Sequence, residues 1–234
     1  MLYAVEIGNS RTKVTCFSEE GLMLGDTHYF DRLDLSWWPN LGINDVLRIA
    51  NTSNLQLQQD WERHVISLKD PWPFAFSCSP SIGIDRCLGV LGARMHQPNG
   101  SIGVISCGTC MTATLLTEDD RLLGGSISPG WKMRLDAMAD YAPSLPRLSA
   151  VMAQFSPEGT RNTEESLHQG AYAGMYAEIE KICTVWSTQD ANIHIFITGG
   201  DGMAFAKPLE SGIFAASNLE AHGIFAQYKY GQQR

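Results

Sequence analysis

Four turns rich in glycine follow runs of β-forming residues, and turns of this kind are suited to holding phosphate groups. Glycine lets neighbouring backbone N–H groups point into one space, because no Cβ blocks the approach, and such concave nests bind anions. Neither GxxxxGK(S/T) nor GxGxxG occurs, so the two common nucleotide-binding folds are disfavoured. The four turns together predict a phosphate-binding cleft of another type. They read EIGNS, SCGT, LGGSISPG and ITGGD, at residues 6–10, 106–109, 123–130 and 197–201.

The sequence GIDR, from Gly83 to Arg86, places a carboxylate next to a guanidinium at the junction of a loop and a helix. In a functional interpretation, Asp85 accepts the proton of a hydroxyl group and Arg86 binds an anion. In a structural interpretation, Asp85 only stabilises the positive end of the helix dipole. The residues themselves leave both interpretations open.

Two cysteines three positions apart, Cys107 and Cys110, invite a metal or redox interpretation. A zinc half-site needs a partner, but the chain has no second CxxC and no HxxxH. A redox pair needs its first cysteine at a helix N-terminus, whereas β-branched residues flank this pair on both sides. We therefore predict a hairpin here, with all six cysteines reduced and mostly buried. The six histidines likewise show no ligand or triad spacing.

The composition is that of an ordinary globular protein and argues against nucleic-acid-binding and membrane proteins. The 234 residues are 44% hydrophobic and 18% charged, which suffices for one large domain or two small ones. The net charge of −8 and the lack of a Lys and Arg cluster argue against nucleic-acid binding. No stretch reaches the ~20 apolar residues of a membrane span, and no signal peptide is recognisable. The expected location is the cytoplasm, without membrane attachment.

The first half of the chain predicts an antiparallel meander of three strands, followed by helices. Asn44 is a possible N-cap for the first of these helices. Residues 70–83 are rich in Pro and Ser and predict a loop. Strands are expected at 2–8, 12–17 and 22–30, helices at 43–50 and 84–95, and a helix that runs into a strand at 55–68.

The second half repeats the order of strand, glycine-containing turn, strand, turn and strand, which suggests two similar α/β halves. The best boundary by composition is HQPNG, residues 96–100. A long helix at 162–186 has Asn162 or Thr163 as its cap, and its apolar stripe either packs in the core or contacts a second copy. The stripe consists of Leu167, Ala171 and Met175. The other expected elements are strands at 101–106, 110–117, 121–128 and 192–198, and helices at 129–141 and 218–230.

The order of these motifs resembles that of the type III pantothenate kinases, a family in the superfamily of actin, sugar kinases and heat-shock chaperones. The resemblance runs nearly from end to end, and the combination of motifs is more specific than any one of them. It rests on EIGNSRTKVTCF, PSIGIDRCLGVLGA, VISCGTCMT, GGSISPGWKMRLDAM, NTEESLHQGAYAG and ITGGDG, all in the family order.

The resemblance implies an α/β fold of two ribonuclease-H-like domains, residues 1–100 and 101–234, with mixed sheets flanked by helices. It also implies a homodimer that phosphorylates the primary hydroxyl of pantothenate with ATP and Mg²⁺, the first step of coenzyme A biosynthesis. Such a transfer depends on positioning and charge neutralisation more than on covalent chemistry.

The resemblance also assigns the residues of the site. Asp85 is the proton acceptor, and Thr163 contacts pantothenate across the dimer. The residues implied to bind ATP are Glu6, Gly8, Asn9, Ser10, Arg11, Thr12, Lys13 and Thr109. The residues implied to bind pantothenate are Phe76, Gly83, Ile84, Asp85, Arg86 and Thr163.

Three positions depart from the family pattern. Glu6 stands where the family has Asp, and keeps the charge on a longer side chain. Ser106 stands where the family has the aspartate that binds a monovalent cation, K⁺ or NH₄⁺, and removes that charge. Phe76 replaces a tyrosine and lacks its hydroxyl. These differences leave two alternatives open: a catalytically impaired regulatory protein that binds nucleotide or pantothenate, and a kinase of the same superfamily with another substrate.

Overall fold

The structure is a computed structural model that describes residues 1–31, 41–153, 155–206 and 213–233. It divides into two compact units. The sequence predicts a single boundary near residue 100, whereas in the structure each unit is assembled from separate segments and the C-terminal segment belongs to the first. The first unit consists of Met1–Asn99, Leu115–Gly124 and Asn218–Arg234, and the second of Gly100–Thr114 and Gly125–Ser217.

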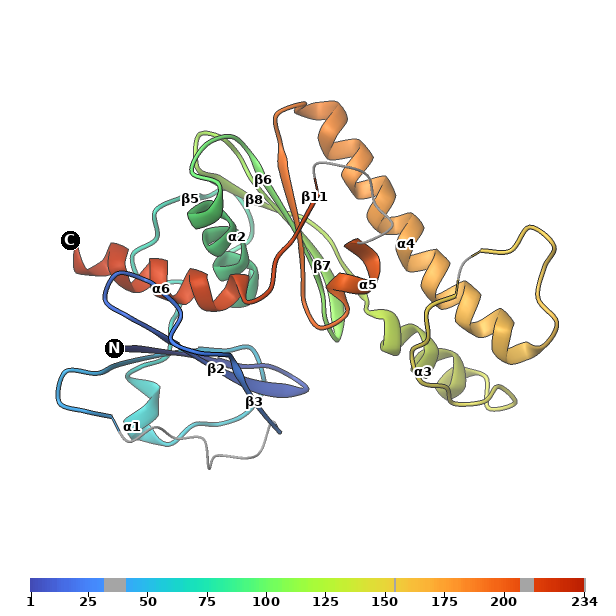
Figure 1. Cartoon of the computed structure of the whole chain (residues 1–234), viewed down its shortest axis with the longest axis horizontal. Helices are drawn as coiled ribbons and strands as arrows, with labels where there is room; N and C mark the ends of the chain where they lie inside the picture. The colour runs from blue at the N-terminus through green and yellow to red at the C-terminus, as the bar shows by residue number, and fades with distance from the viewer. Residues whose placement is uncertain (32–40, 154, 207–212, 234) are drawn as a thin grey trace. The chain divides into compact units, whose positions relative to one another are not determined.

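A four-stranded mixed sheet in the order β3-β2-β1-β4 belongs to the first unit. Two of its strands, β2 and β3, are labelled in Figure 1. Strands β1, β2 and β3 form the predicted antiparallel meander, and β4 runs parallel to β1. The register places Glu6 directly opposite Lys13. The third strand is shorter than the predicted 22–30. The bounds are Leu2–Ile7 for β1, Arg11–Phe17 for β2, His28–Asp31 for β3 and Val46–Asn51 for β4.

The helix predicted at 43–50 is wrong, because this segment forms strand β4. Leu47 and Ile49 are fully buried in a core on one face of the sheet. A short apolar run bounded by turns has no decisive period, so its pairing with β1, which is a tertiary contact, determines its state. Asn44 lies in a turn before the strand and caps no helix.

The segment 55–68 holds less regular structure than predicted. Helix α1 spans only Gln59–Glu62, and Val65 forms a single bridge with Ile49 in place of a strand. The predicted loop at 70–83 is interrupted only by the two-residue strand β5, Ala75–Phe76, which pairs in parallel with β8, Arg121–Gly124.

Two helices of the first unit, α2 (Ile84–His96) and α6 (Leu219–Gln232), lie side by side (Figure 1). Their backbones approach at two glycines. A Cβ at Gly92 would lie 1.9 Å from the carbonyl oxygen of Leu219, and a Cβ at Gly223 would lie 2.0 Å from that of Leu88. Only glycine permits this contact, since every other residue would push the helices apart.

We expect Gly223→Ala to lower the free energy of unfolding by about 1–3 kcal/mol or more, the usual cost of overpacking. The added methyl group meets the α2 backbone, which cannot move aside as a flexible side chain would. The measurement is urea denaturation of the purified protein. Gly231→Ala on the same helix is the matched control, because no atom lies within 4 Å of its added Cβ. Equal stability of the two variants would contradict the close packing of α2 and α6.

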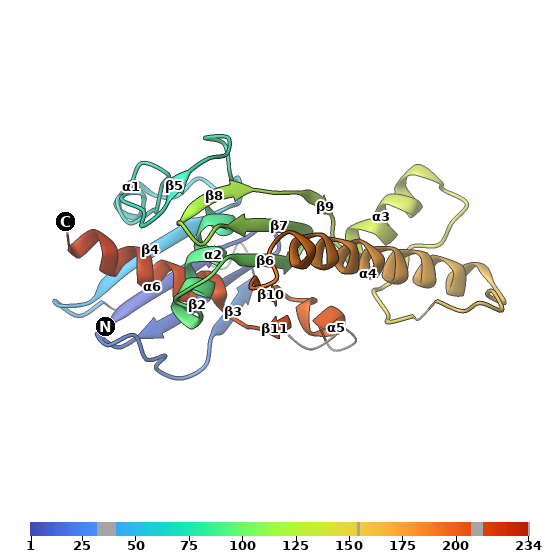
Figure 2. The same ribbon diagram turned by 90° about the horizontal axis from the view of Figure 1, so that it is seen from above.

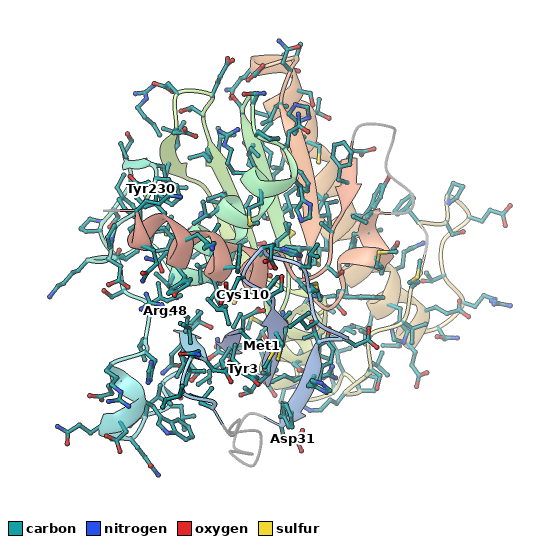
Figure 3. All side chains as sticks on the ribbon, turned by 60° about the vertical axis from the view of Figure 1, so that its left-hand side comes forward. Met1, Tyr3, Asp31, Arg48, Cys110 and Tyr230 are labelled. Atoms are coloured by element: carbon teal, nitrogen blue, oxygen red, sulfur yellow. The ribbon has the colours of Figure 1, made fainter. Side chains whose placement is uncertain are left out.

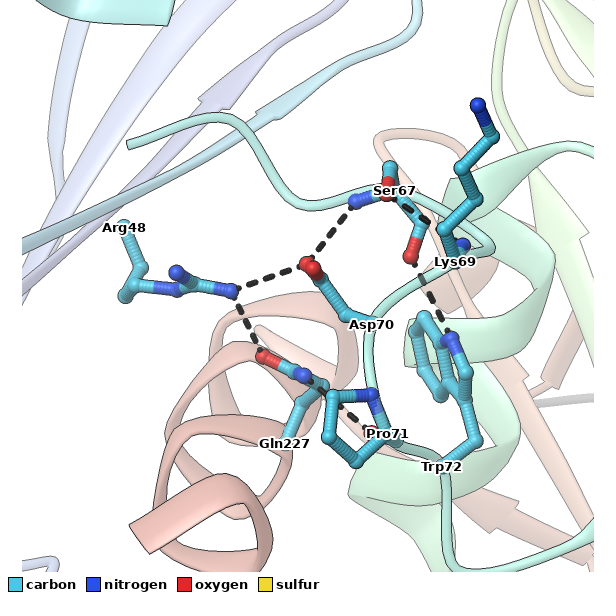
Figure 4. A network of polar contacts seen from close by, with 7 residues as sticks. All are labelled: Arg48, Ser67, Lys69, Asp70, Pro71, Trp72 and Gln227. Carbon is cyan, nitrogen blue, oxygen red and sulfur yellow. Dashed lines mark hydrogen bonds and ion pairs between the residues drawn. The ribbon is translucent and has the colours of Figure 1, made fainter. Parts of the chain in front are cut away.

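A partly buried polar network fixes α6 to the sheet (Figure 4). Figure 3 labels Arg48, from which the network starts, and Tyr230 of α6. Arg48 of β4 donates from Nη2 to Asp70 Oδ2 at 3.1 Å and to Gln227 Oε1 of α6 at 3.0 Å. Gln227 in turn donates to the carbonyl oxygen of Pro71 at 3.2 Å. Because Gln227 is buried and both ends of its amide are paired, the network sets the position of the helix along its axis.

The second unit contains a sheet in which β11, β10 and β6 run parallel and β7 follows β6, with β9 paired to β7. The strand predicted at 121–128 is divided into β8 and β9, because Gly124 and Gly125 both adopt positive φ. The last residues of β7, Leu115 and Leu116, pair with β8 in the first unit. The bounds are Ile102–Cys107 for β6, Cys110–Leu116 for β7, Ile127–Pro129 for β9, His194–Thr198 for β10 and Ile213–Ala215 for β11.

The long helix α4, Thr163–Gln189, begins as predicted, with Asn162 as its N-cap. The Asn162 side chain accepts from the N–H of Glu165 at 2.9 Å. The stripe of Leu167, Ala171 and Met175 is 7%, 2% and 0% exposed and packs in the core of the second unit. The stripe is therefore ordinary core and offers no surface to a second copy. Helix α3, Trp131–Tyr141, lies beside α4, and α5 spans Gly202–Ala206 (Figure 2).

The predicted class, mixed α/β with sheets flanked by helices, is confirmed. Within the described ranges, none of the helices combines the length and the apolar character needed to cross a bilayer.

Candidate active site

The turn between β1 and β2 presents Asn9, Ser10 and Arg11 at the surface. The N–H of Gly8 donates to the carbonyl oxygen of Arg11 at 3.0 Å and closes the turn. Because the N–H of Gly8 is already paired within the turn, a bound phosphate would contact the residues after Gly8. The turn is short and its ends are fixed by strand pairing, which suits a backbone anion site.

The side chain of Thr12 points away from the surface of this turn. It is 1% exposed, and its hydroxyl has no hydrogen-bond partner among the described atoms. Successive side chains of a strand point to opposite faces, so Thr12 shares a face with the buried Val14, and Lys13 shares the other with Glu6. The run from Gly8 to Lys13 therefore does not present all its side chains to one ligand.

Glu6 and Lys13 form a cross-strand ion pair in which Lys13 Nζ lies 3.0 Å from Glu6 Oε2. Burial alone lowers the pKa of Lys13, but the charges of Glu6 and Glu220 outweigh burial and raise that pKa. Lys13 therefore keeps its positive charge at neutral pH, as a residue that binds phosphate requires.

Asp85 lies half-buried in the first turn of α2, whose N-cap is Gly83. Burial raises the pKa of this carboxyl, while the backbone N–H and the charge of Arg86 oppose the rise. The carboxylate folds back toward the helix N-terminus, since a Cβ on Gly83 would lie only 2.5 Å from Asp85 Oδ1. The geometry suits a base, because a carboxylate with a raised pKa accepts protons more readily.

We expect Gly83→Ala to reduce kcat roughly tenfold without lowering the melting temperature by more than a degree or two. The backbone at Gly83 has φ −63°, which alanine adopts freely, so the fold tolerates the change. The new methyl group displaces the carboxylate of Asp85, and the rate of a reaction that uses this carboxylate as its base depends on its exact position. Steady-state kinetics and thermal unfolding test this together. Full activity of the variant would show that the folded-back position of Asp85 is unimportant.

Glu220 joins this group of side chains, and the sequence gives no signal for it. It lies in the first turn of α6 and is only 9% exposed. Its pKa is raised to about 7 by burial and by the charge of Glu6, against the opposing effect of Lys13, and Asp85 adds a smaller rise. More than 130 residues separate Glu220 from Asp85 in the chain, so only the return of α6 to the first unit brings them together.

Three of the four glycine turns converge at the end of β6 in the second unit. A Cβ at Gly130 would lie 2.1 Å from the carbonyl oxygen of Gly108, and one at Gly199 would lie 2.4 Å from that of Cys107. Asp201 donates its N–H to the same Cys107 carbonyl at 3.0 Å. The EIGNS turn lies in the first unit, so the phosphate-binding cleft of four turns stays a prediction.

Other residues assigned from the sequence lie at several places. Ser106 is half-buried and pairs with Thr198 of β10, and Thr109 is exposed in the turn after β6. Thr163 is the exposed first residue of α4. Phe76, in the first unit, is 37% exposed and packs edge-on against Phe74.

The cysteine pair lies at the predicted hairpin, and both thiols are free. Burial raises the pKa of Cys107 to about 12, so the reactive thiolate is strongly disfavoured. Among the described residues, no three His, Cys, Asp or Glu side chains are grouped as metal ligands.

The fold is shared with solved structures of low sequence identity. A conserved Baf family protein from Campylobacter jejuni gives a TM-score of 0.66 at 20% identity, over 99% of this chain and 100% of that one. The inorganic polyphosphate/ATP-glucomannokinase from Arthrobacter sp. strain KM gives 0.50 at 12% identity, over 100% and 99%. The chain therefore has the same α/β fold class as these two proteins.

Sequence relatives define the family within this class. A model of the type III pantothenate kinase family matches residues 44–185. The type III pantothenate kinase of Flavobacterium psychrophilum is 30% identical over 98% of this chain and 99% of its own length. That of Flavobacterium johnsoniae is 29% identical over 98% of each chain. The chain belongs to the type III pantothenate kinase family.

Proposed function

We propose that this chain transfers the γ-phosphoryl group of Mg·ATP to the primary hydroxyl of pantothenate and releases ADP, in the cytoplasm. The observation that carries the proposal is the placement of Asp85, a half-buried carboxylate with a raised pKa in the same unit as the Glu6–Lys13 ion pair. The product, 4'-phosphopantothenate, is the first intermediate of coenzyme A biosynthesis.

In this mechanism Asp85 accepts the proton of the pantothenate hydroxyl as its oxygen attacks the γ-phosphorus. The bond from phosphorus to the bridging oxygen of ADP breaks, and ADP leaves with the electron pair. The half-buried position of Asp85 supports the role, since a raised pKa brings a carboxyl closer to the operating pH. Arg86, beside it on α2, would bind the carboxylate of pantothenate, with Gly83, Ile84 and Phe76 nearby in the chain.

The ATP phosphates would contact the exposed turn Asn9–Arg11 and the ammonium of Lys13. The support is chemical: short glycine turns present N–H groups, and Lys13 keeps its charge. Magnesium arrives with ATP as part of the substrate and neutralises charge on the phosphates.

The family pattern also implies a K⁺ or NH₄⁺ ion at position 106, and the residue present does not fit it. Ser106 offers a neutral hydroxyl in place of the family's aspartate and supplies no charge to hold a cation there. No step of the proposed mechanism uses this ion.

The comparisons favour an enzyme over a regulatory protein that only binds nucleotide or pantothenate, since the full-length relatives above are named as kinases. We also propose that each of the two units is a ribonuclease-H-like domain. The order of strands in the first unit, a meander with a parallel fourth strand, supports this proposal.

The deciding experiment is turnover of ATP with pantothenate by the purified chain. The expected result is stoichiometric formation of ADP and 4'-phosphopantothenate. ADP formation with other small alcohols but not with pantothenate would redirect the proposal to another substrate, and no turnover with any acceptor would refute it.

A homodimer, in which Thr163 contacts pantothenate bound to the second copy, is a further part of the proposal. Its support is the exposure of Thr163 together with exposed apolar side chains of the second unit that a second copy would cover. These side chains are Tyr141, Val151, Met152 and Phe155. Light scattering at micromolar concentration tests the dimer, and a monomer would contradict it.

A further inference from the structure

The peptide group between Ile7 and Gly8 leads into the turn between β1 and β2, and hydrogen bonds hold it at both ends. Its N–H, which belongs to Gly8, donates to the carbonyl oxygen of Arg11 at 3.0 Å. Its carbonyl oxygen, which belongs to Ile7, accepts from the backbone N–H of Thr52 at 2.9 Å and from Thr52 Oγ1 at 3.3 Å. Because a peptide group is planar, these bonds fix its orientation as a unit.

Thr52 reaches this peptide because β4 runs parallel to β1. The register places Asn51, the last residue of β4, opposite Ile7, so the two strands end side by side at the same edge of the sheet. Asn51 Oδ1 then accepts from the N–H of Ser53 at 3.1 Å and from Ser53 Oγ at 2.8 Å. Its Nδ2 donates to the carbonyl oxygen of Leu55 at 2.9 Å. Thr52 therefore lies in a loop that its own side chains hold in place, within the first unit.

The turn needs such an anchor because it begins at Gly8. Glycine adopts many backbone conformations, so a turn that starts at glycine can direct the N–H groups after it in several ways. The pairing of β1 with β2 closes the turn on one side, and Thr52 holds the entering peptide from β4 on the other. Donors that are held in place before binding bind an anion more tightly, because less ordering remains to be done.

We propose that Thr52 is a positioning residue for the binding of ATP. It acts through the peptide group between Ile7 and Gly8 and keeps the N–H groups of residues 9–11 directed toward the triphosphate. The inference rests on the proposed function, because it requires the phosphates of ATP at this turn. A threonine that only ended β4 would contribute to stability and leave the affinity for nucleotide unchanged.

The test replaces Thr52 by valine, which has the same shape and lacks the hydroxyl. Calorimetry on the full chain measures the binding of a non-hydrolysable ATP analogue with Mg²⁺. We expect Thr52→Val to bind the analogue roughly three- to tenfold more weakly, the effect of about one hydrogen bond. Thr52→Ser keeps the hydroxyl and should restore the affinity. In steady-state kinetics the KM for ATP should rise in Thr52→Val, while the KM for pantothenate stays unchanged.

Thr27→Val is the matched control. The Thr27 hydroxyl is hydrogen-bonded to Thr15 Oγ1 at 2.9 Å in the same unit, and Thr15 pairs with Ala4, at a distance along the strands from the turn. This variant also loses one hydroxyl with its hydrogen bond, and it should lower the stability without changing the affinity for the analogue.

Amide hydrogen exchange gives a readout that needs no nucleotide. The N–H of Gly8 should exchange faster in Thr52→Val than in the natural chain, since its peptide group has lost one anchor, and at the natural rate in Thr27→Val. If Thr52→Val does not fold, Thr52→Ala takes its place with the same expected results.

Equal affinity of the natural chain and Thr52→Val for the analogue, together with normal turnover of the natural chain with pantothenate, overturns this inference alone. A natural chain that does not bind the analogue refutes the proposed function, and the inference with it. An equal loss of affinity in Thr52→Val and Thr27→Val also overturns the inference, because the effect would then come from stability.

Discussion

Replacing Asp85 by asparagine should lower kcat by roughly 10²- to 10⁴-fold, the usual contribution of a positioned general base. The amide has the shape of the carboxylate, and its oxygen can still accept from the N–H of Arg86, so the first turn of α2 should keep its structure. It cannot accept the proton of the pantothenate hydroxyl. Pantothenate binding, measured by calorimetry, should change by less than about threefold.

The pH dependence gives a second measurement of the same prediction. The base acts in its ionised form, and burial raises the pKa of Asp85 above its ordinary value. The rate of the natural chain should therefore fall as pH decreases through that raised pKa. The rate of Asp85→Asn should not show this fall at low pH. Asp119→Asn, at an exposed turn of the same unit, is the control and should retain full activity. A nearly full rate for Asp85→Asn would show that another group accepts the proton.

Replacing Ser106 by aspartate should create a dependence on K⁺ that the natural chain lacks. The natural chain is expected to work equally well in Na⁺ and K⁺ buffers, because a neutral hydroxyl cannot compensate a cation next to the phosphates. An aspartate restores a full charge at the end of β6. A charged contact contributes about 1.5–3 kcal/mol, so addition of K⁺ should raise the rate of Ser106→Asp roughly tenfold or more.

Ser106→Asn separates charge from size in this experiment, since it matches aspartate in volume and carries no charge. It should show no preference for K⁺. Strong activation of the natural chain by K⁺ would refute the prediction, because the cation site would then not need the aspartate. Ser106→Asp in K⁺ is then compared with the natural chain in its best buffer. If the variant is faster, the natural chain is a weakened kinase.

Local motifs were sufficient to identify part of the candidate site. Gly83 and Asp85 lie two positions apart at the start of α2, and the helix holds them together with no help from distant segments. Glu6 and Lys13 are joined by one tight turn, so strand pairing places them opposite each other once the hairpin forms. The cap of α4 at Asn162 follows the same logic, because a capping box involves only neighbouring residues.

Glu220 could not be found in this way. In the sequence it is one acidic residue in a helix, a position that is normally solvated. Its burial depends on Gly92 and Gly223, which let α6 approach α2, and on Arg48 and Gln227, which fix the helix to β4. Neither contact has a signature in the spacing of the residues.

The sequence by itself determined the meander, the long helices and the glycine turns, because turn chemistry, caps and helical spacing act between near neighbours. Tertiary structure decided the state of residues 43–50, where pairing with β1 turned an ambiguous apolar run into a strand. It also decided the return of the C-terminal helix to the first unit, and with it the burial of a carboxyl beside Glu6 and Lys13. The physical reason is the same in both cases: burial against a distant segment outweighs the weak local preferences of a short stretch of chain.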